Sequence, residues 1–134
     1  PLDSQDKFHL WLKSAKPQGP HMRVLLYQLK EQRAKCPECG LEFTRSVQKG
    51  VDVGLATLIV KLAHRNQYDT LLLSSGDGDL KDAIDYVCGT LGKNVNLCVF
   101  RDSVSTDLQS YADRIYWINE FAEEVRRIMP SGTA

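Results

Sequence analysis

Three aspartates show the spacing most suggestive of chemistry in this chain of 134 residues. Asp77 and Asp79 lie in the run S-S-G-D-G-D at residues 74–79, directly after a short apolar stretch. Asp52 lies earlier, in V-D-V at residues 51–53, near the start of a helical pattern. Carboxylates gathered at one point repel one another, and a hard divalent cation such as Mg²⁺ or Mn²⁺ relieves that repulsion. A metal held in this way can activate a water for attack on a phosphodiester.

A structural role is the alternative for each of these aspartates taken alone. Asp79 would cap a helix, Asp77 would serve a turn, and Asp52 would be a favourable charge in a first helical turn. A calcium loop of the EF-hand type is excluded, because counting from Asp77 puts Asp82 at position 6 and Cys88 at position 12, where that loop needs Gly and Glu.

A second candidate metal site is the cysteine knuckle C-P-E-C-G, residues 36–40. Cys36 and Cys39 would supply two of the four ligands that a structural zinc ion needs. The other two could come from His21, from a second subunit in a homodimer, or from a segment upstream of this chain, and a relic without metal is the remaining alternative. Cys88 and Cys98 lie in apolar stretches and are expected in the core. This cysteine usage does not indicate a disulfide scaffold, so a cytoplasmic location is expected.

The elements that must position these residues alternate between helices and strands. Apolar spacing predicts helices at 4–16, 51–65, 79–91, 105–112 and 120–128, and strands at 22–29, 69–75, 95–100 and 114–118. Such alternation predicts an α/β fold, with a mostly parallel sheet and helices on both faces. Ligands bind at the carboxyl ends of parallel strands, which is where S-S-G-D-G-D would lie. The polar segment 31–48, which carries the knuckle, is expected to be an insert rather than a packed element.

Composition and charge narrow the class of protein. Hydrophobic residues make up 43% and charged residues 25%, which is typical of a globular domain. No apolar run approaches the roughly 20 residues that a membrane span needs. The net charge is zero, but residues 1–49 hold nine basic and five acidic side chains, whereas residues 50–134 hold eight and twelve. This division fits cations that hold a polyanion near carboxylates that hold a metal, and scatter over solvated surfaces is the alternative.

Four motifs occur in order along the chain. They are K-G-V-D-V-G-L at 49–55, Y-D-T-L-L-L-S-S-G-D-G-D-L at 68–80, G-K-N-V at 92–95 and S-T-D-L-Q-S-Y-A-D at 105–113. Together they resemble the NYN domain, the LabA-like branch of the PIN-like nuclease superfamily, over residues 49–119. The resemblance implies a three-layer, Rossmann-like PIN fold for residues 1–134 as a single domain, with the knuckle insert at about 31–48. That insert also resembles one found in some bacterial members.

The resemblance implies roles for individual residues. Asp52, Asp77 and Asp79 match the catalytic, metal-holding acids of the family. Lys49, Ser75 and Ser105 match other motif positions and are expected near the substrate. Asp113 also matches a motif position, whose role is less clear.

The knuckle is surrounded by cations that are expected to contact RNA phosphates without reading sequence. These cations are Lys30, Arg33, Lys35, Arg45 and Lys49. A solvated loop is the alternative for each of them.

One departure concerns the first strand. Family members begin with a strand that ends in a further metal-site aspartate, and no such segment precedes Ser4. The first strand is therefore expected to be missing from this chain. The alternative is that the protein lacks this strand, and the metal site would then be short of one aspartate.

The leading functional hypothesis is a metal-dependent ribonuclease that uses Mg²⁺ or Mn²⁺ and acts on RNA. The alternative is a non-catalytic nucleic-acid-binding or assembly module derived from such a nuclease. A third, weaker hypothesis is a Toprim-like phosphotransfer domain, which would need Glu31, at the end of the strand predicted at 22–29, to lie beside Asp77.

Overall fold

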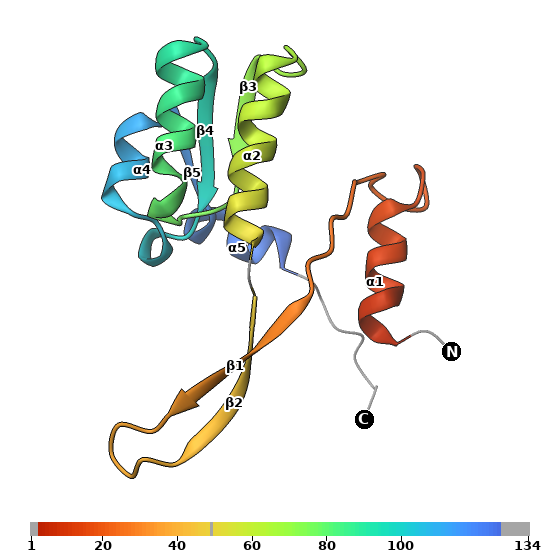
Figure 1. Ribbon diagram of the computed structural model, residues 1–134. Coiled ribbons are helices and arrows are strands. Elements are labelled where there is room, and N and C mark those ends of the chain that lie inside the picture. The colour runs from red at the N-terminus through yellow and green to blue at the C-terminus, as the bar shows by residue number, and fades with distance from the viewer. Residues whose placement is uncertain (1–2, 49, 127–134) are drawn as a thin grey trace. The chain divides into compact units, whose positions relative to one another are not determined.

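The chain is described by a computed structural model, which covers residues 3–48 and 50–126. These residues fall into two compact units, one up to Gly50 and the other from Val51. In Figure 1, the colour follows the chain through the helices and strands of each unit. The assignment of the whole chain to a single domain stays a prediction.

The second unit is built on a parallel sheet. Its strands are β3 (Thr70–Leu73), β4 (Asn94–Val99) and β5 (Arg114–Trp117), in the order β3-β4-β5. The register pairs Leu71 with Val95 and Leu97 with Ile115. The strands predicted at 69–75, 95–100 and 114–118 are confirmed, and so is the α/β class.

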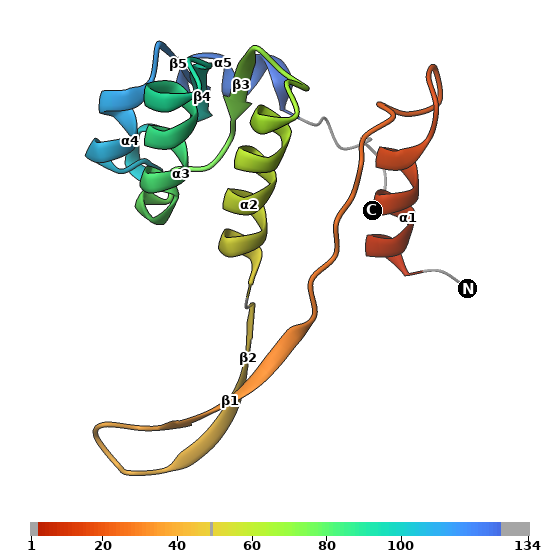
Figure 2. The same cartoon turned by 45° about the horizontal axis from the view of Figure 1, so that its top comes forward.

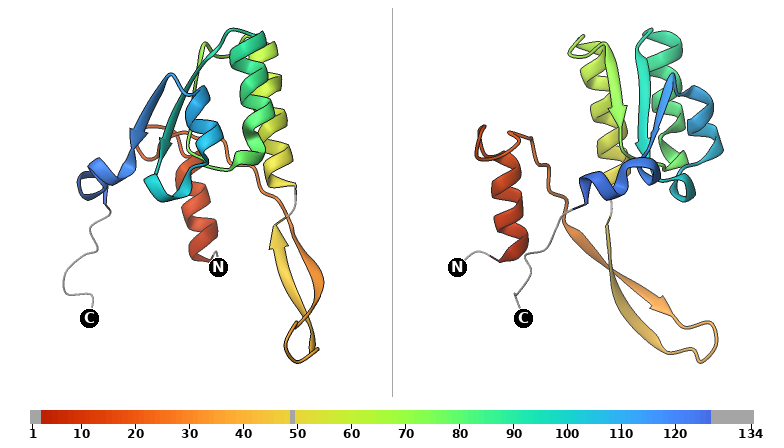
Figure 3. Two further views of the ribbon diagram at one scale, coloured as in Figure 1. Left: turned by 90° about the vertical axis from the view of Figure 1, so that its left-hand side faces the viewer. Right: turned by 180° about the vertical axis from the view of Figure 1, so that it is seen from behind.

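Helical segments connect these strands. They are α2 (Val51–His64), η1 (Gly78–Leu80), α3 (Lys81–Asp85), η2 (Tyr86–Thr90), η3 (Arg101–Ser103), α4 (Thr106–Tyr111) and α5 (Ile118–Val125). The helix predicted at 79–91 is thus a run of 3₁₀, α and π turns, and Gly92 follows it at φ +69°, a conformation that glycine adopts without strain. In Figure 3, α2 and α3 lie side by side against one face of the sheet.

The hydrophobic core lies between this face of the sheet and the helices. Its buried members are Ile59, Ala63, Leu73, Leu80, Ile84, Val87, Val95, Leu97, Val99 and Leu108. Alternate strand residues point to the opposite face, where Leu72 is 61% exposed and Tyr116 38%. A second helical layer, as in the predicted three-layer fold, therefore stays a prediction.

The first unit contains a helix and a hairpin. Helix α1 (Ser4–Lys13) is capped by Asp3, whose carboxylate accepts a hydrogen bond of 2.7 Å from the N–H of Asp6. Strands β1 (Leu29–Lys35) and β2 (Glu42–Gln48) pair in antiparallel fashion, and Figure 2 shows the twist of this hairpin. No hydrophobic side chain is buried among the described residues of this unit.

One expectation for the first unit is wrong. The segment 22–28 contains no strand, and the side chains of Met22 and Leu26 are exposed. Alternating apolar residues form a strand only when a neighbouring strand accepts their backbone hydrogen bonds, and the described residues offer this segment no such partner. The segment 31–48 contains the paired hairpin, in which Arg33 lies opposite Thr44, and its assignment as an insert stays a prediction.

No helix in the described part of the chain is both long enough and apolar enough to cross a bilayer.

Candidate metal centre

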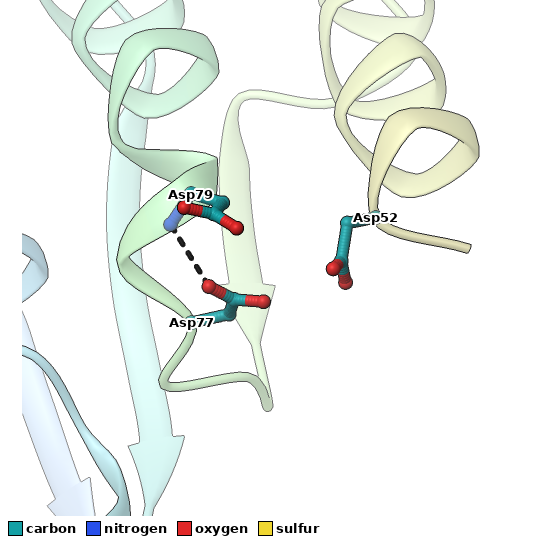
Figure 4. Close-up of side chains that lie close together, drawn as sticks. All are labelled: Asp52, Asp77 and Asp79. Carbon is teal, nitrogen blue, oxygen red and sulfur yellow. Dashed lines mark hydrogen bonds between the residues drawn. The ribbon is translucent and has the colours of Figure 1, made fainter. Parts of the chain in front are cut away.

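Three carboxylates from two elements converge in the second unit. Asp52 lies in the first turn of α2, Asp77 follows β3 in the turn before η1, and Asp79 lies within η1. One carboxylate oxygen from each residue lies within 4.8 Å of the corresponding oxygens of the other two. Figure 4 shows the three side chains gathered in the space between α2 and the turn. The structure thus brings together the aspartates that the sequence singled out.

The turn is organised by Asp77 rather than by Asp79. Asp77 is the N-cap of η1, and its Oδ1 accepts a hydrogen bond of 2.9 Å from the N–H of Asp79 (Figure 4). The helix cap was expected at Asp79; that expectation is wrong, because the cap is Asp77, two residues earlier. Ser75 supports the turn more weakly, since its hydroxyl accepts from the N–H of Asp77 at 3.4 Å.

The charges of the three carboxylates act on one another. The charge of Asp77 is the largest cause that raises the pKa of Asp52 above its ordinary value. Partial desolvation, a hydrogen bond with Asp77 and the charge of Asp79 raise that pKa further. A raised carboxylate pKa shows that the folded chain concentrates negative charge at this point.

This donor set fits a hard divalent cation. All three donors are carboxylate oxygens, which Mg²⁺ and Mn²⁺ prefer over nitrogen or sulfur. Asp52 and Asp79 are exposed and Asp77 is half-buried, so waters or a phosphate have access to the remaining coordination positions.

Two glycines shape the acidic turn. The carbonyl of Gly76 accepts a hydrogen bond of 3.0 Å from the N–H of Ser105, and a Cβ at Gly76 would overlap the carbonyl of Ser103. A Cβ at Gly78 would come within 3.3 Å of the Ser105 hydroxyl oxygen. The G-D-G run at residues 76–78 was the signal for this turn in the sequence, because glycine has no Cβ and lets another backbone approach closely.

Ser105 and Asp113 make hydrogen bonds that hold the fold together. Ser105 is the N-cap of α4, and its hydroxyl accepts from the N–H of Leu108 at 3.2 Å. The Asp113 carboxylate accepts from the N–H of Val95 at 2.8 Å, while the N–H of Asp113 donates to the Val95 carbonyl at 2.7 Å. Both motif residues therefore have a structural role in the second unit.

The cations predicted around the knuckle are divided between the two faces of the hairpin. Opposite residues of an antiparallel pair share a face, and successive residues alternate. Lys30 and Arg45 consequently lie on one face, and Arg33 and Lys35 on the other. Lys49 lies outside the described residues.

Glu31, which the Toprim-like hypothesis needs, does not follow the end of a strand. It lies inside β1, opposite Ser46. The strand-end premise of that hypothesis is therefore wrong.

The cysteine knuckle forms the turn of the hairpin. The N–H of Cys36 donates to the carbonyl of Leu41, and the N–H of Gly40 donates to the carbonyl of Cys36, each at 2.9 Å. Backbone N–H groups of Cys39 and Glu38, in that order, lower the pKa of the Cys36 thiol. Within the described part of the first unit, no His, Cys, Asp or Glu joins the pair to make a three-ligand group. His21, which was one expected ligand, does not complete the site.

Comparisons with known proteins identify the family of this chain. A solved structure of a protein of unknown function from Vibrio parahaemolyticus RIMD 2210633 is similar, with a TM-score of 0.61 and 24% sequence identity. The match covers 88% of this chain and 63% of that chain, so this chain spans less than two thirds of its length. No curated protein matches the chain. The family model of the NYN domain matches residues 3–119. The chain therefore belongs to the NYN domain family, a family of PIN-like nucleases.

Proposed function

We propose that this protein is a metal-dependent ribonuclease whose acidic centre consists of Asp52, Asp77 and Asp79. The observation that carries the proposal is the convergence of three carboxylate oxygens within 4.8 Å, in a chain that belongs to a nuclease family. A structural role explains only part of this arrangement. Capping η1 accounts for Asp77, but it does not require Asp52 to approach from a different helix.

The three aspartates would hold Mg²⁺ or Mn²⁺. When bound, such an ion supplies an activated water and stabilises the leaving oxygen of a phosphodiester. The chain provides a preorganised frame for it, because the cap bond from the Asp79 N–H fixes the Asp77 side chain. Asp52 is held by the first turn of α2, which the core anchors through Ile59.

Other residues would bind and orient the RNA. Ser75 accepts a hydrogen bond from the N–H of Asp77, and the N–H of Ser105 donates to the carbonyl of Gly76. Both serines therefore lie at the acidic turn and are proposed to border the scissile phosphate. Arg45 and Lys49 are proposed to contact phosphates further along the strand, because such contacts contribute affinity without reading sequence. Each of these roles is open to test by substitution.

The test is cleavage of labelled RNA by the full-length protein with Mn²⁺. Asp77→Asn should abolish cleavage while the fold persists, because an asparagine side-chain oxygen can still accept the cap bond. Asp82→Asn is the matched control, since Asp82 is an exposed acid of the same unit outside the triad. Equal cleavage by the wild type and Asp77→Asn would show that the assignment is wrong.

The second candidate function is a non-catalytic RNA-binding or assembly module. It is favoured by the hairpin, which presents cations on both faces. This candidate predicts retention of intact RNA, with an affinity that falls steeply as salt increases. Gel retention without turnover, in the presence of Mn²⁺, would select it over the nuclease.

A further inference from the structure

The cysteine knuckle, residues 36–40, supplies half of a tetrahedral zinc site. Cys36 and Cys39 both lie in the turn between β1 and β2. Cys39 is exposed and Cys36 is half-buried, and neither is in a disulfide. Structural zinc sites are closed by four ligands, and thiolates are the softest and most favoured of these. Two thiolates alone would leave the ion open to water.

The described residues of the first unit do not provide the other two ligands. No histidine, carboxylate or further thiol of this unit joins the pair. Cys88 and Cys98 belong to the second unit, where Cys88 contacts the carbonyl of Asp85 through its Sγ and Cys98 lies on β4. Cys88 packs against the hydrophobic core. Cys98 is half-buried between the core residues Leu97 and Val99 of β4, so its side chain lies on the other face of the sheet, and the expectation that it belongs to the core is wrong.

A second copy of the chain could supply both ligands at once. Two such turns related by a two-fold axis would present four thiols, in two symmetry-equivalent pairs. Leu41, directly after the knuckle, is 66% exposed, and it would be shielded from water at such a contact. Within the described residues, β1 and β2 form a sheet of two strands, so the hairpin would also gain the restraint that an isolated two-stranded ribbon needs.

We propose that the knuckles of two chains share one zinc ion, held by Cys36 and Cys39 of each chain, and that this ion joins the protein into a homodimer. Each thiol loses its proton to solvent as it binds the ion, and no oxidation is involved. The zinc ligands share no residue with the acidic centre, so the proposal does not depend on nuclease activity.

The experiment is native mass spectrometry of the full chain, purified with a reductant and supplied with zinc alone. We expect a dimer that carries one zinc ion for every two chains, and conversion to monomers after chelation. Cobalt in place of zinc should give the visible absorption of a tetrahedral tetrathiolate. Cys36→Ser and Cys39→Ser should each abolish zinc retention and dimerisation, whereas Cys88→Ser should leave both unchanged.

Several outcomes would overturn the proposal. One zinc ion per monomer would mean that the chain completes the site by itself. A dimer that persists without zinc would indicate other contacts between the chains. A chain that binds no zinc and is lighter by the mass of two hydrogens would indicate an internal disulfide. Circular dichroism of the serine variants distinguishes loss of the site from loss of the fold, because the second unit does not contain the knuckle.

Discussion

The backbone N–H of Ser105 donates a hydrogen bond of 3.0 Å to the carbonyl of Gly76. This bond joins the acidic turn after β3 to the start of α4, although the two residues lie far apart in the sequence. The carbonyl of Ser103 occupies the space that a side chain at position 76 would need. The position of Asp77 therefore depends on a backbone contact with the segment before α4.

Gly76→Ala should destabilise the protein by about 1–3 kcal/mol, because the added methyl forces the two backbones apart. Urea unfolding followed by circular dichroism measures the change. Gly89→Ala is the matched control, because a Cβ there meets only Asp85 at an ordinary 3.6 Å, and alanine in a helical position is favoured by about 0.5–1 kcal/mol. Equal stability of the wild type and Gly76→Ala would contradict the close approach.

Asp52→Asn should stabilise the metal-free protein at neutral pH. The pKa of Asp52 is raised above its ordinary value of 3.8, chiefly by the charge of Asp77. The folded chain therefore holds this proton more tightly than the unfolded chain, and the free energy of unfolding falls as pH rises from 3.8 through the raised pKa. The variant should gain melting temperature at pH 7 and converge with the wild type below the ordinary pKa.

The melting temperatures of the wild type, Asp52→Asn and Asp82→Asn with and without Mn²⁺ test the metal centre. Mn²⁺ should raise the melting temperature of the wild type, because an ion that binds only the folded state stabilises it. Asp52→Asn should respond less, and Asp82→Asn should respond like the wild type. A gain from Mn²⁺ that is the same in all three proteins would argue against a site at the triad.

Leu97→Ala should cost about 2–5 kcal/mol, because Leu97 is fully buried at the centre of the sheet and its loss leaves a cavity. Chemical denaturation gives the change in the free energy of unfolding. Leu72→Ala is the control of the same chemistry, since Leu72 lies on β3 but is 61% exposed. A large loss from Leu72→Ala would show that something covers the opposite face of the sheet.

Ser105→Ala should reduce stability by about 1 kcal/mol, because the N–H of Leu108 loses its cap. Ser105→Asp should restore most of that stability, since aspartate caps equally well. RNA cleavage by the two variants then separates the structural role from a role in substrate binding. If alanine leaves stability unchanged, the cap contributes nothing measurable.

Local patterns predicted the second unit well. The apolar face of α2, with Leu55 and Ile59, and the buried run of β3 need only near neighbours in sequence to be recognised. Asp77 and Asp79 could be placed at the ligand-binding edge because they follow a parallel strand, and Asp52 could be placed near them because its helix was expected to begin near the same edge. Residues 22–28 misled the prediction, because their alternation resembles a strand and pairing depends on a partner elsewhere in the chain. The contact of Gly76 with Ser103 could not be read from the sequence for the same reason.

The pair of hydrogen bonds between Asp113 and Val95 has a consequence for reading other members of the family. Asp113 ties the entry of β5 to the entry of β4, so its role is in the fold and not in the proposed metal centre. Under the proposed function, a relative that keeps this aspartate but replaces Asp77 should adopt the same sheet and hold no ion. The two acids thus give independent readouts of a relative: Asp113 reports on the sheet, and Asp77 reports on the proposed centre.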